Sequence, residues 1–448
     1  MAAEPSYPEV ERSLLGRWPE SRLDPSLDRI RRLTDLLGDP QHGYAVVHVT
    51  GTNGKTSTSR MIDALLRGTG LRCGRYTSPH LQAMTERISL DGESLSADQF
   101  VLAYLDVSPY VEVVDRSAAH PMSFFEVVTG MAFAAFADAP VDAAVVEVGM
   151  GGAWDATNVA DGQVAVVTPV AVDHASYLGD QPADIAVEKA GIIKPGAMAV
   201  LASQADEVTE VLQRRAAEVG ATLALEGADF GVGSRVPGVG GQVVSIRGLA
   251  REYDDLFLPL HGEYQARNAA CALAAVEAFL GGNEIDPDIA REALSGVTSP
   301  GRLEVARRSP TIVLDGAHNP HGAQATVQAL QEAFAFSPLV GVVGVMGDKD
   351  AEGLLAAFEP VFAEIVCTQN STPRALPAAE LGDVAEGVFG TDRVHVSSRL
   401  DDALDVGAAL AEGGGGGLGQ SLGSGGVLVT GSVVTVGEAR TLLGMHPG

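Results

Sequence analysis

The sequence predicts an α/β protein with two domains, and three observations support this. Short apolar runs rich in β-branched residues alternate with Ala- and Leu-rich helical stretches, which is typical of βαβ units around a mostly parallel sheet. The alternation is interrupted once and then resumes. A chain of 448 residues also exceeds what one hydrophobic core usually organises, and an apolar fraction of 46% supplies enough material for two cores.

The first group of predicted strands lies in the N-terminal part of the chain. It comprises residues 44–50, 143–148, 164–168 and 197–201. Most of these runs end at or just before a Gly, a Thr or an acidic residue. Because ligand chemistry in parallel sheets gathers at the carboxyl ends of the strands, we expect the functional site at these ends.

A second group of predicted strands follows an interruption at residues 295–301, which read SGVTSPG. This group comprises residues 311–314, 339–345, 365–368 and 427–430. We therefore predict a larger domain over residues 1–297 and a smaller one over residues 298–448. Between residues 227 and 259 the sequence is Gly-rich and alternating, which favours small antiparallel strands over another βαβ unit.

Composition excludes several classes of function. The net charge of −28 is spread along the chain without any Lys/Arg-rich run, so nucleic acid is a poor candidate partner. The N-terminus has no signal-peptide pattern and no later segment reaches the apolar length of a membrane span, so we expect a cytoplasmic protein with no membrane partner. A small anionic substrate remains compatible, because a few cations and metal ions can dominate a local site.

The strongest local signal is a Gly-rich turn between a predicted strand and a predicted helix. Residues 44–50 are followed by Gly51-Thr52-Asn53-Gly54-Lys55-Thr56-Ser57 and then by a helix-compatible segment. In such a P-loop the backbone N–H groups bind phosphate oxygens, Lys55 reaches the β/γ-phosphates, and the hydroxyl of Thr56 or Ser57 meets Mg²⁺. Val49 stands where the standard spacing has Gly, and a chance Gly-rich turn is the alternative. The flanking strand and helix favour an ATP site.

Further motifs carry a resemblance to a known family. The loop HVTGTNGKTS resembles the nucleotide loop of the folylpolyglutamate synthase and dihydrofolate synthase family and, more distantly, that of the Mur ligases. The distinguishing segments follow in the family's order. They are YTSPHL (76–81), ERI (86–88), EVGMGG (147–152), DATN (155–158), DH (173–174), EKAGI (188–192), GRLE (301–304) and DGAHNP (315–320).

The resemblance implies a fold and an activity. It implies a P-loop NTPase-like domain with a mostly parallel sheet that binds ATP and folate, and a smaller Rossmann-like glutamate-ligase domain. The implied activity is addition of L-glutamate to dihydropteroate, extension of tetrahydrofolates with γ-linked glutamates, or both. ATP would activate the carboxylate as an acyl phosphate, and Mg²⁺ would be required. We expect both activities, and a monomer.

The resemblance also implies site residues. Ser78, Glu147 and His174 match magnesium ligands, and Lys189 matches a lysine that CO₂ carbamylates so that it can bind a second Mg²⁺. The expected nucleotide contacts are Thr52, Asn53, Gly54, Lys55, Thr56, Ser57, Asn268, Arg302, Asp315 and His318. Lys55, Lys189 and His318 are the expected catalytic residues. The plain alternatives are a hydrogen-bonded loop histidine for His174, a surface lysine for Lys189 and a structural ion pair for Arg302.

The substrate pocket is expected at residues 122–126, which resemble the family's T-F-F-E element. Its members here are Met122, Ser123, Phe124 and Phe125, together with Asp155. We expect Phe124 to stack on the pterin ring and Asp155 to accept its N–H donors, whereas Phe125 could equally pack in the core. Relatives often read G-G-R-L-D where this chain has Gly-Gly-Ala-Trp-Asp, so an arginine is lost.

Two other functions fit part of the sequence. A Mur-type ligase that acts on a UDP-linked peptidoglycan precursor shares the chemistry, but such enzymes carry a whole domain before the P-loop, where this chain has only about fifty residues. A non-enzymatic nucleotide switch would keep the P-loop but would not need Glu147, His174 and Lys189 in register.

Overall fold

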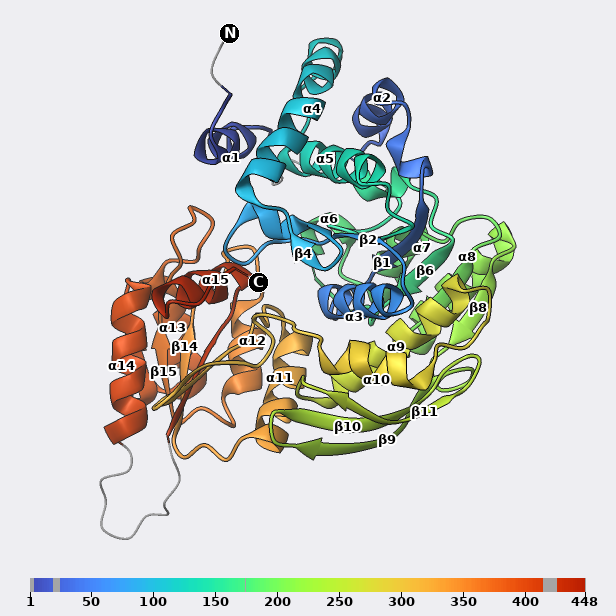
Figure 1. Cartoon of the computed structure of the whole chain (residues 1–448). Helices are drawn as coiled ribbons and strands as arrows, with labels where there is room; N and C mark the ends of the chain where they lie inside the picture. Colours follow the sequence, from blue (N-terminus) through green and yellow to red (C-terminus); the bar gives the residue numbers. More distant parts are fainter. Residues whose placement is uncertain (1–3, 19–24, 174, 414–424, 448) are drawn as a thin grey trace.

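The computed structural model describes residues 4–18, 25–173, 175–413 and 425–447. Strands in these residues form one sheet of eight strands, one of three and one of six. Figure 1 shows the six-stranded sheet and its helices beside the body that contains the other two sheets.

The eight-stranded sheet holds the P-loop. Its strand order is β4-β3-β2-β5-β1-β6-β7-β8, in which β2 and the strands from β5 to β8 run parallel and β3 and β4 form an antiparallel edge. The bounds are β1 Ala45–Thr50, β2 Cys73–Tyr76, β3 Ile88–Leu90, β4 Glu93–Ser94, β5 Ala143–Glu147, β6 Val164–Val167, β7 Met198–Leu201 and β8 Thr222–Leu225.

Helices cover both faces of this sheet because alternate strand residues are apolar on each side. Val46 and Val146 face one helical layer, whereas Val47 and Val145 face the other. The first layer contains α1 Tyr7–Leu15, α2 Asp28–Leu36, α4 Ala97–Ser117, α5 Phe124–Asp138, α7 Pro182–Ala190 and α8 Asp206–Val219; the short α6 is Ala175–Leu178. The second contains α3 Lys55–Gly68, α9 Glu263–Phe279 and α10 Pro287–Ser295.

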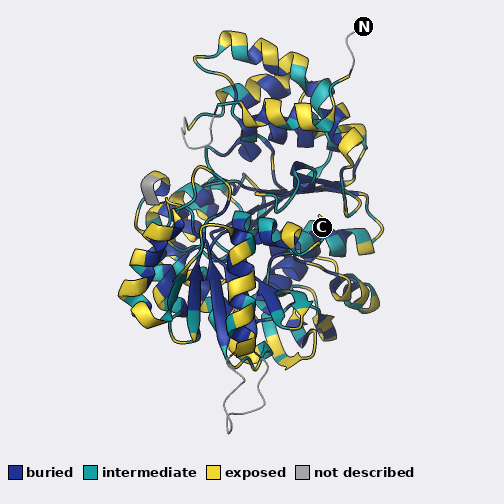
Figure 2. Ribbon diagram, turned by 90° about the vertical axis from the view of Figure 1, so that its left-hand side faces the viewer, coloured by how far each residue is buried: buried dark blue, intermediate teal, exposed yellow. Residues whose placement is uncertain are grey.

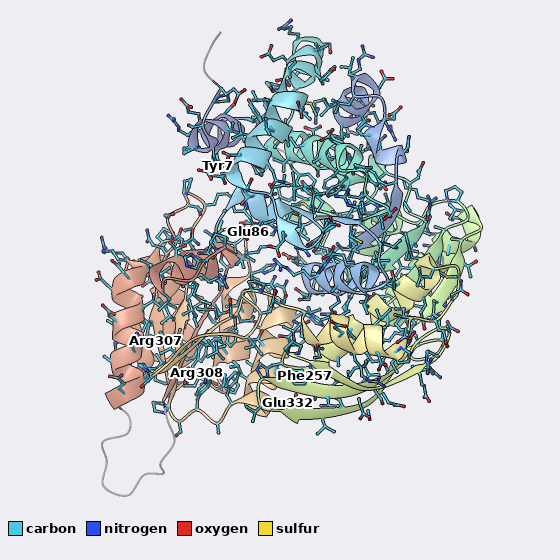
Figure 3. The ribbon with its side chains drawn as sticks, viewed as in Figure 1. Tyr7, Glu86, Phe257, Arg307, Arg308 and Glu332 are labelled. Atoms are coloured by element: carbon cyan, nitrogen blue, oxygen red, sulfur yellow. The ribbon has the colours of Figure 1, made fainter. Side chains whose placement is uncertain are left out.

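The Gly-rich segment forms the small antiparallel sheet that the sequence predicts. Its strands are β9 Gly231–Gly238, β10 Gly241–Arg247 and β11 Glu252–Leu258. This sheet packs on α9 and α10, outside the second helical layer. It also touches the C-terminal part, since Arg235 of β9 forms an ion pair of 2.8 Å with Glu332, which is labelled in Figure 3.

The six-stranded sheet belongs to the C-terminal part of the chain. Its order is β12-β13-β17-β14-β15-β16, with only β12 antiparallel. The bounds are β12 Glu304–Arg308, β13 Thr311–Leu314, β14 Leu339–Val343, β15 Glu364–Cys367, β16 Val394–Val396 and β17 Gly426–Thr430. Helices α11 Pro320–Ala333, α12 Ala351–Phe358 and α13 Ala378–Phe389 cover one face, and α14 Leu400–Gly413 and α15 Val433–Leu442 cover the other. Figure 2 shows the buried strands between helices with exposed outer faces.

Both predicted groups of strands are present, with ends that differ by one or two residues. The chain passes from the first two sheets to the third between α10 and β12, a stretch that contains the predicted boundary at residue 297. The sequence interpretation missed β2, β3, β4, β8, β12 and β16. In the described part of the chain, no helix combines the length and apolar character needed to cross a membrane.

Candidate active site

The P-loop connects β1 to α3, as the sequence predicts. Two of its glycines adopt positive φ angles, 143° at Gly51 and 91° at Gly54. A Cβ at Gly54 would lie 2.7 Å from Oδ1 of Asn268, and one at Gly51 would lie 1.9 Å from Oγ1 of Thr168. Side chains of neighbouring elements therefore press directly against the loop, and only glycine fits at either position. Asn268 supports the loop from behind and does not line the cavity.

Lys55 folds back over the loop that carries it. Its Nζ donates to the carbonyl oxygens of Gly51 and Thr52, each at 3.1 Å. Burial lowers the pKa of Lys55, which Glu147 and Asp173 counteract. The ammonium group thus lies in the turn where the P-loop geometry brings phosphate oxygens, and its carbonyl partners are replaceable by such oxygens.

Thr56 and Glu147 form the centre of the predicted magnesium site. The Thr56 hydroxyl donates to Oε1 of Glu147 at 2.9 Å. Oε2 of Glu147 is buried and has no hydrogen-bond partner among the described residues. Burial raises the pKa of Glu147 to about 7. A buried carboxylate with one unused oxygen beside a P-loop hydroxyl fits a divalent cation, because Mg²⁺ prefers oxygen ligands of this kind.

Ser78 completes this group from the turn after β2. The turn is held by Glu86, labelled in Figure 3, whose carboxylate accepts the backbone N–H groups of Leu81 and Gln82 at 2.8 and 2.9 Å. Ser78 lines the same cavity as Thr56 and Glu147. Ser57 is oriented differently, since its buried hydroxyl bonds that of Ser299 at 2.9 Å. Of the two predicted hydroxyls, Thr56 is therefore the one beside Glu147.

Lys189 enters the cavity from α7. It is 4% exposed, and its Nζ donates to the carbonyl of Gly51 at 2.8 Å. Burial, and then the nearby charge of Lys55, lower the pKa of Lys189 to about 7. It is therefore not the surface lysine of the plain alternative. The fourth predicted ligand, His174, lies outside the described residues, and no three His, Cys, Asp or Glu side chains in the described ranges converge on one point.

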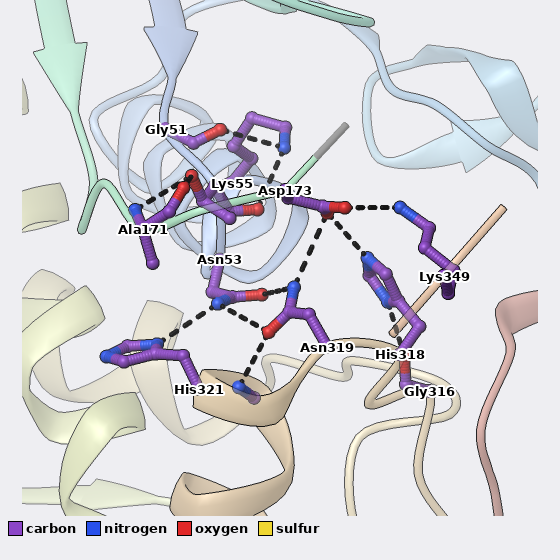
Figure 4. A network of polar contacts seen from close by, with 12 residues as sticks. Gly51, Asn53, Lys55, Ala171, Asp173, Gly316, His318, Asn319, His321 and Lys349 are labelled. Atoms are coloured by element: carbon purple, nitrogen blue, oxygen red, sulfur yellow. Dashed lines mark hydrogen bonds and ion pairs between the residues drawn. The ribbon is translucent and has the colours of Figure 1, made fainter. Parts of the chain in front are cut away.

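Asp173 joins the two parts of the molecule, as Figure 4 shows. Its carboxylate forms an ion pair with Lys349, contacts Nε2 of His318 at 3.3 Å and accepts from Nδ2 of Asn319 at 3.4 Å. Asn319 also exchanges hydrogen bonds of 3.2 and 3.3 Å with the P-loop residue Asn53. Lys349 and Asn319 were not predicted as site residues. The only signals for them in the sequence are the short motifs that contain them, D-K-D and H-N-P.

Arg302 and His318 line the cavity from the C-terminal side, as predicted. Asp315 does not line it. Its Oδ2 accepts the N–H of Leu303 at 3.0 Å, and its Oδ1 accepts the N–H of Ala317 and the hydroxyl of Thr326. The structure thus gives Asp315 a supporting role, in which it fixes the segments that carry Arg302 and His318.

The predicted pterin residues divide into two kinds. Met122 is buried in the core, and Ser123 caps α5 by accepting from the N–H of Glu126. The Arg87 guanidinium lies 4.7 Å above the ring of Phe124, so that face already has a partner. Phe125 instead lies over Gly149, where a Cβ would come within 2.5 Å of its ring. Phe125, rather than Phe124, therefore borders the loop that follows Glu147.

Asp155 is fully engaged within its own loop. Oδ2 accepts from the N–H of Met150 at 2.9 Å, and Oδ1 accepts from both the N–H and the hydroxyl of Thr157. It caps the short 3₁₀ helix Ala156–Val159. Both oxygens of Asp155 hold the loop that follows Glu147, and the expectation that Asp155 accepts the N–H donors of the pterin stays a prediction.

The cavity collects these groups at the carboxyl ends of β1, β2 and β5. Its lining includes the P-loop, Ser78, Glu147, Lys189, Arg302 and His318. The carboxylate of Glu147 thus shares the cavity with Lys55 from the first part of the chain and Arg302 from the second, and backbone N–H groups lie at the N-terminus of α3. This arrangement suits binding of a nucleoside triphosphate with a divalent cation and transfer of its terminal phosphoryl group.

Known proteins share this architecture. The family model of the Mur ligase middle domain matches residues 49–276, and that of the Mur ligase glutamate ligase domain matches residues 301–433. A dihydrofolate synthase/folylpolyglutamate synthase from Mycobacterium tuberculosis is 50% identical over 98% of this chain and 94% of its own length. A protein of that description from Escherichia coli is 30% identical over 82% of this chain and 83% of its own.

Solved structures agree with the sequence comparisons. Folylpolyglutamate synthase from M. tuberculosis, complexed with ADP and AMPPCP, has a TM-score of 0.94 and covers 99% of each chain at 50% identity. An E. coli protein in complex with DHPP and ADP has a TM-score of 0.85 over 98% of each chain at 28% identity. With matching family models, identity and fold over nearly its whole length, this chain belongs to the folylpolyglutamate synthase/dihydrofolate synthase family of the Mur ligase superfamily.

Proposed function

We propose that this protein is an ATP-dependent ligase that joins L-glutamate to dihydropteroate and extends tetrahydrofolates with γ-linked glutamates. One observation carries the proposal. The buried Glu147, with one unused oxygen, lies beside the P-loop hydroxyl of Thr56 in a cavity that Lys189 and Arg302 also line. Relatives at 50% and 30% identity are named for both activities.

The chemistry begins with activation of the substrate carboxylate. A carboxylate oxygen attacks the γ-phosphorus of ATP, so that an acyl phosphate forms and ADP leaves. The glutamate amine then attacks the acyl carbon, inorganic phosphate departs and the amine loses a proton. Two anions must approach each other in the first step, and the cations Lys55 and Arg302 reduce their repulsion.

Thr56, Ser78 and Glu147 would hold Mg²⁺, with His174 as the further predicted ligand. Bound there, the ion would neutralise charge on the β- and γ-phosphates. The unused oxygen of Glu147 supports this assignment, because a buried carboxylate oxygen without a hydrogen-bond partner is costly unless a cation compensates it.

Lys189 is proposed to react with CO₂. Its nitrogen would attack the carbon of CO₂, and loss of a proton would leave an anionic carbamate. Burial and the proximity of Lys55 disfavour the ammonium form, which leaves a nucleophilic amine at neutral pH. The carbamate would then supply an oxygen ligand for a second Mg²⁺, as the family resemblance implies.

The two parts of the chain are proposed to bind different substrates. Residues 1–297 would bind ATP and the pterin, and residues 298–448 would bring Arg302, His318 and the glutamate. Phe125 would border the pterin pocket, which is supported by the position of its ring over Gly149 beside the cavity. We also propose a cytoplasmic monomer.

ADP release tests the proposed function. Purified protein is incubated with ATP, Mg²⁺ and L-glutamate, and dihydropteroate, tetrahydrofolate and no pterin are compared, with a UDP-muramoyl peptide and its own amino acid as a further arm. We expect release with both pterins and little without them. Turnover with only a UDP-muramoyl peptide and its amino acid would replace the proposal with Mur-type ligation, and pterin-independent ATP hydrolysis would favour a nucleotide switch.

A further inference from the structure

A second cavity lies away from the catalytic centre. It occupies about 510 Å³ where α2, α7 and α8 meet, which is within the usual range for small-molecule sites. Its floor includes Ala153 and Asn158, and Val187 and Val211 contribute apolar walls. No residue that lines it also lines the catalytic cavity.

The charge of this cavity is opposite to that of the chain. The whole sequence has 58 acidic and 30 basic residues. The cavity is lined by Arg31, Lys194, Arg214 and Arg215, with Glu218 as its one acidic lining residue. A strongly acidic protein thus gathers four cations around one hollow.

These cations are incompletely neutralised. Nε of Arg215 is buried without a hydrogen-bond partner among the described residues, and one of its terminal nitrogens donates to the carbonyl of Ile193 at 3.3 Å. Lys194 donates to the carbonyl of Asn158 at 2.9 Å and has only a long 3.9 Å contact with Asp161. Burial lowers the pKa of Lys194, Asp161 counteracts this in part, and Arg31 and Arg215 lower the pKa further. An anion in the cavity would relieve this repulsion.

The cavity is linked to the loop that follows Glu147 through hydrogen bonds of the Asn158 side chain. Asn158 donates to the carbonyls of Ala153 and Gly191 at 2.9 and 3.2 Å. Lys189 projects from α7 into the catalytic cavity, whereas Val187 and Lys194 line the second one. A ligand here would therefore contact the back of the loop that follows Glu147 without blocking ATP.

We propose that this cavity binds the tail of a poly-γ-glutamylated folate, at a site separate from the catalytic cavity; the inference rests on the proposed function. Each γ-linked residue presents one free α-carboxylate on a chain of methylene groups. This alternation of carboxylates and methylene groups matches a cavity in which cations lie among valine and leucine side chains. A polyphosphate matches the cavity less well, because it has dense charge and no apolar spacer.

Charge reversal at the rim tests the proposal. Arg31 and Arg214 are exposed, so the variant R31E/R214E should fold. Arg32→Glu is the matched control, because Arg32 follows on the same helix, is 56% exposed and does not line the cavity. Calorimetry measures binding of pteroyltri-γ-glutamate, pteroylmonoglutamate and inorganic tripolyphosphate to enzyme loaded with Mg²⁺ and a non-hydrolysable ATP analogue, and circular dichroism checks the fold.

We expect the double variant to lose at least tenfold in affinity for the triglutamate, with monoglutamate affinity and turnover unchanged and the control like wild type. Higher salt should weaken the wild-type triglutamate complex. Equal triglutamate affinity in all three proteins would overturn the proposal, as would tripolyphosphate binding more tightly at the same arginines. Wild-type enzyme without folate-dependent ADP release would instead refute the proposed function.

Discussion

Burial opposes the charge of Glu147, although Lys55, Thr56 and Arg302 favour it. Burial raises the pKa of Glu147 to about 7, above the ordinary value of 4.5. A carboxyl group whose pKa is raised in the folded state binds more protons there than in the unfolded state. Its ionisation therefore destabilises the fold progressively as pH rises from about 4.5 to about 7, on the order of 3 kcal/mol in full.

The first prediction concerns Glu147→Gln. Because the amide does not ionise, the melting temperature of the variant relative to wild type should increase between pH 5 and pH 8 in the absence of Mg²⁺. Mg²⁺ with ATP should stabilise wild type and not the variant, and turnover should fall by at least a hundredfold. Thermal melts across pH measure this; a pH-independent difference would contradict the pKa assignment.

The second prediction concerns Lys189→Ala. Loss of the carbamate ligand should reduce turnover by at least a hundredfold, and acetate or propionate should restore part of it by supplying a carboxylate in the vacated space. ADP release with and without the acids measures the rescue. Lys55→Ala is the control, because that residue acts as a cation and a carboxylate cannot replace it. Wild-type rates from Lys189→Ala without additives would exclude the carbamate.

Residue-scale roles were only partly predictable from the sequence. Phe124 and Phe125 are adjacent, and the rotation of α5 alone decides which ring meets Gly149 and which meets Arg87. Asp155 has the right chemistry for a pterin, and in this structure its two oxygens accept hydrogen bonds from Met150 before it and Thr157 after it. The local sequence identifies such residues but does not determine how their side chains are oriented.

At the scale of elements, the P-loop depends on two glycines with little space around them. The third prediction compares Gly54→Ala with Gly70→Ala. Both positions have φ near 90°, but a Cβ at Gly54 would meet Asn268 at 2.7 Å, whereas nothing lies within 4 Å at Gly70. Gly70→Ala should cost about 1 kcal/mol of stability and leave activity intact.

Gly54→Ala should in addition displace the loop from α9 and weaken ATP binding by at least tenfold. Fluorescence titration with a labelled ATP analogue, together with urea unfolding, measures both quantities. Equal effects of the two substitutions on nucleotide affinity would show that the contact with Asn268 has no role in shaping the loop.

Element prediction succeeded where the pattern was strong. Runs such as 44–50 are long, apolar and β-branched, so β1 and its parallel neighbours were evident. Strand β2 reads CGRY, with a glycine that accommodates the ring of Phe136 and an arginine paired with Asp63 inside the fold. These tertiary compensations leave no periodic signal, which explains why β2 was missed.

At the scale of the whole molecule, Asp173 and its partners hold the two sheets together over the nucleotide site. The fourth prediction concerns Lys349→Met, which removes a cation with a side chain only 9% exposed. The loss of this ion pair at the buried Asp173 should loosen the junction, so turnover should fall at least tenfold and the radius of gyration in X-ray scattering should increase.

Arg374→Met is the control for this junction. Arg374 pairs with Asp348 at 3.1 Å near Lys349, but its side chain is 51% exposed, so its loss should change neither turnover nor dimensions appreciably. An unchanged scattering profile and turnover for Lys349→Met would show that the Asp173 contacts do not control closure.

The sequence could not have predicted this junction. Asp173 and Lys349 are 176 positions apart and belong to different sheets. A single sequence shows that the strands of both parts end in polar residues, and the P-loop indicates where phosphate binds. How the second part approaches the first depends on packing between domains, which has no local pattern.

The most direct test of the central claim follows the oxygen of the substrate carboxylate. Dihydropteroate labelled with ¹⁸O in its carboxylate is incubated with enzyme, ATP, Mg²⁺ and L-glutamate, and the products are analysed by mass spectrometry. Ligation through an acyl phosphate predicts a glutamate adduct and transfer of one ¹⁸O to each inorganic phosphate released. Unlabelled phosphate without an adduct would mean that water accepts the phosphoryl group, and it would contradict the assignment of this site as a folate–glutamate ligase.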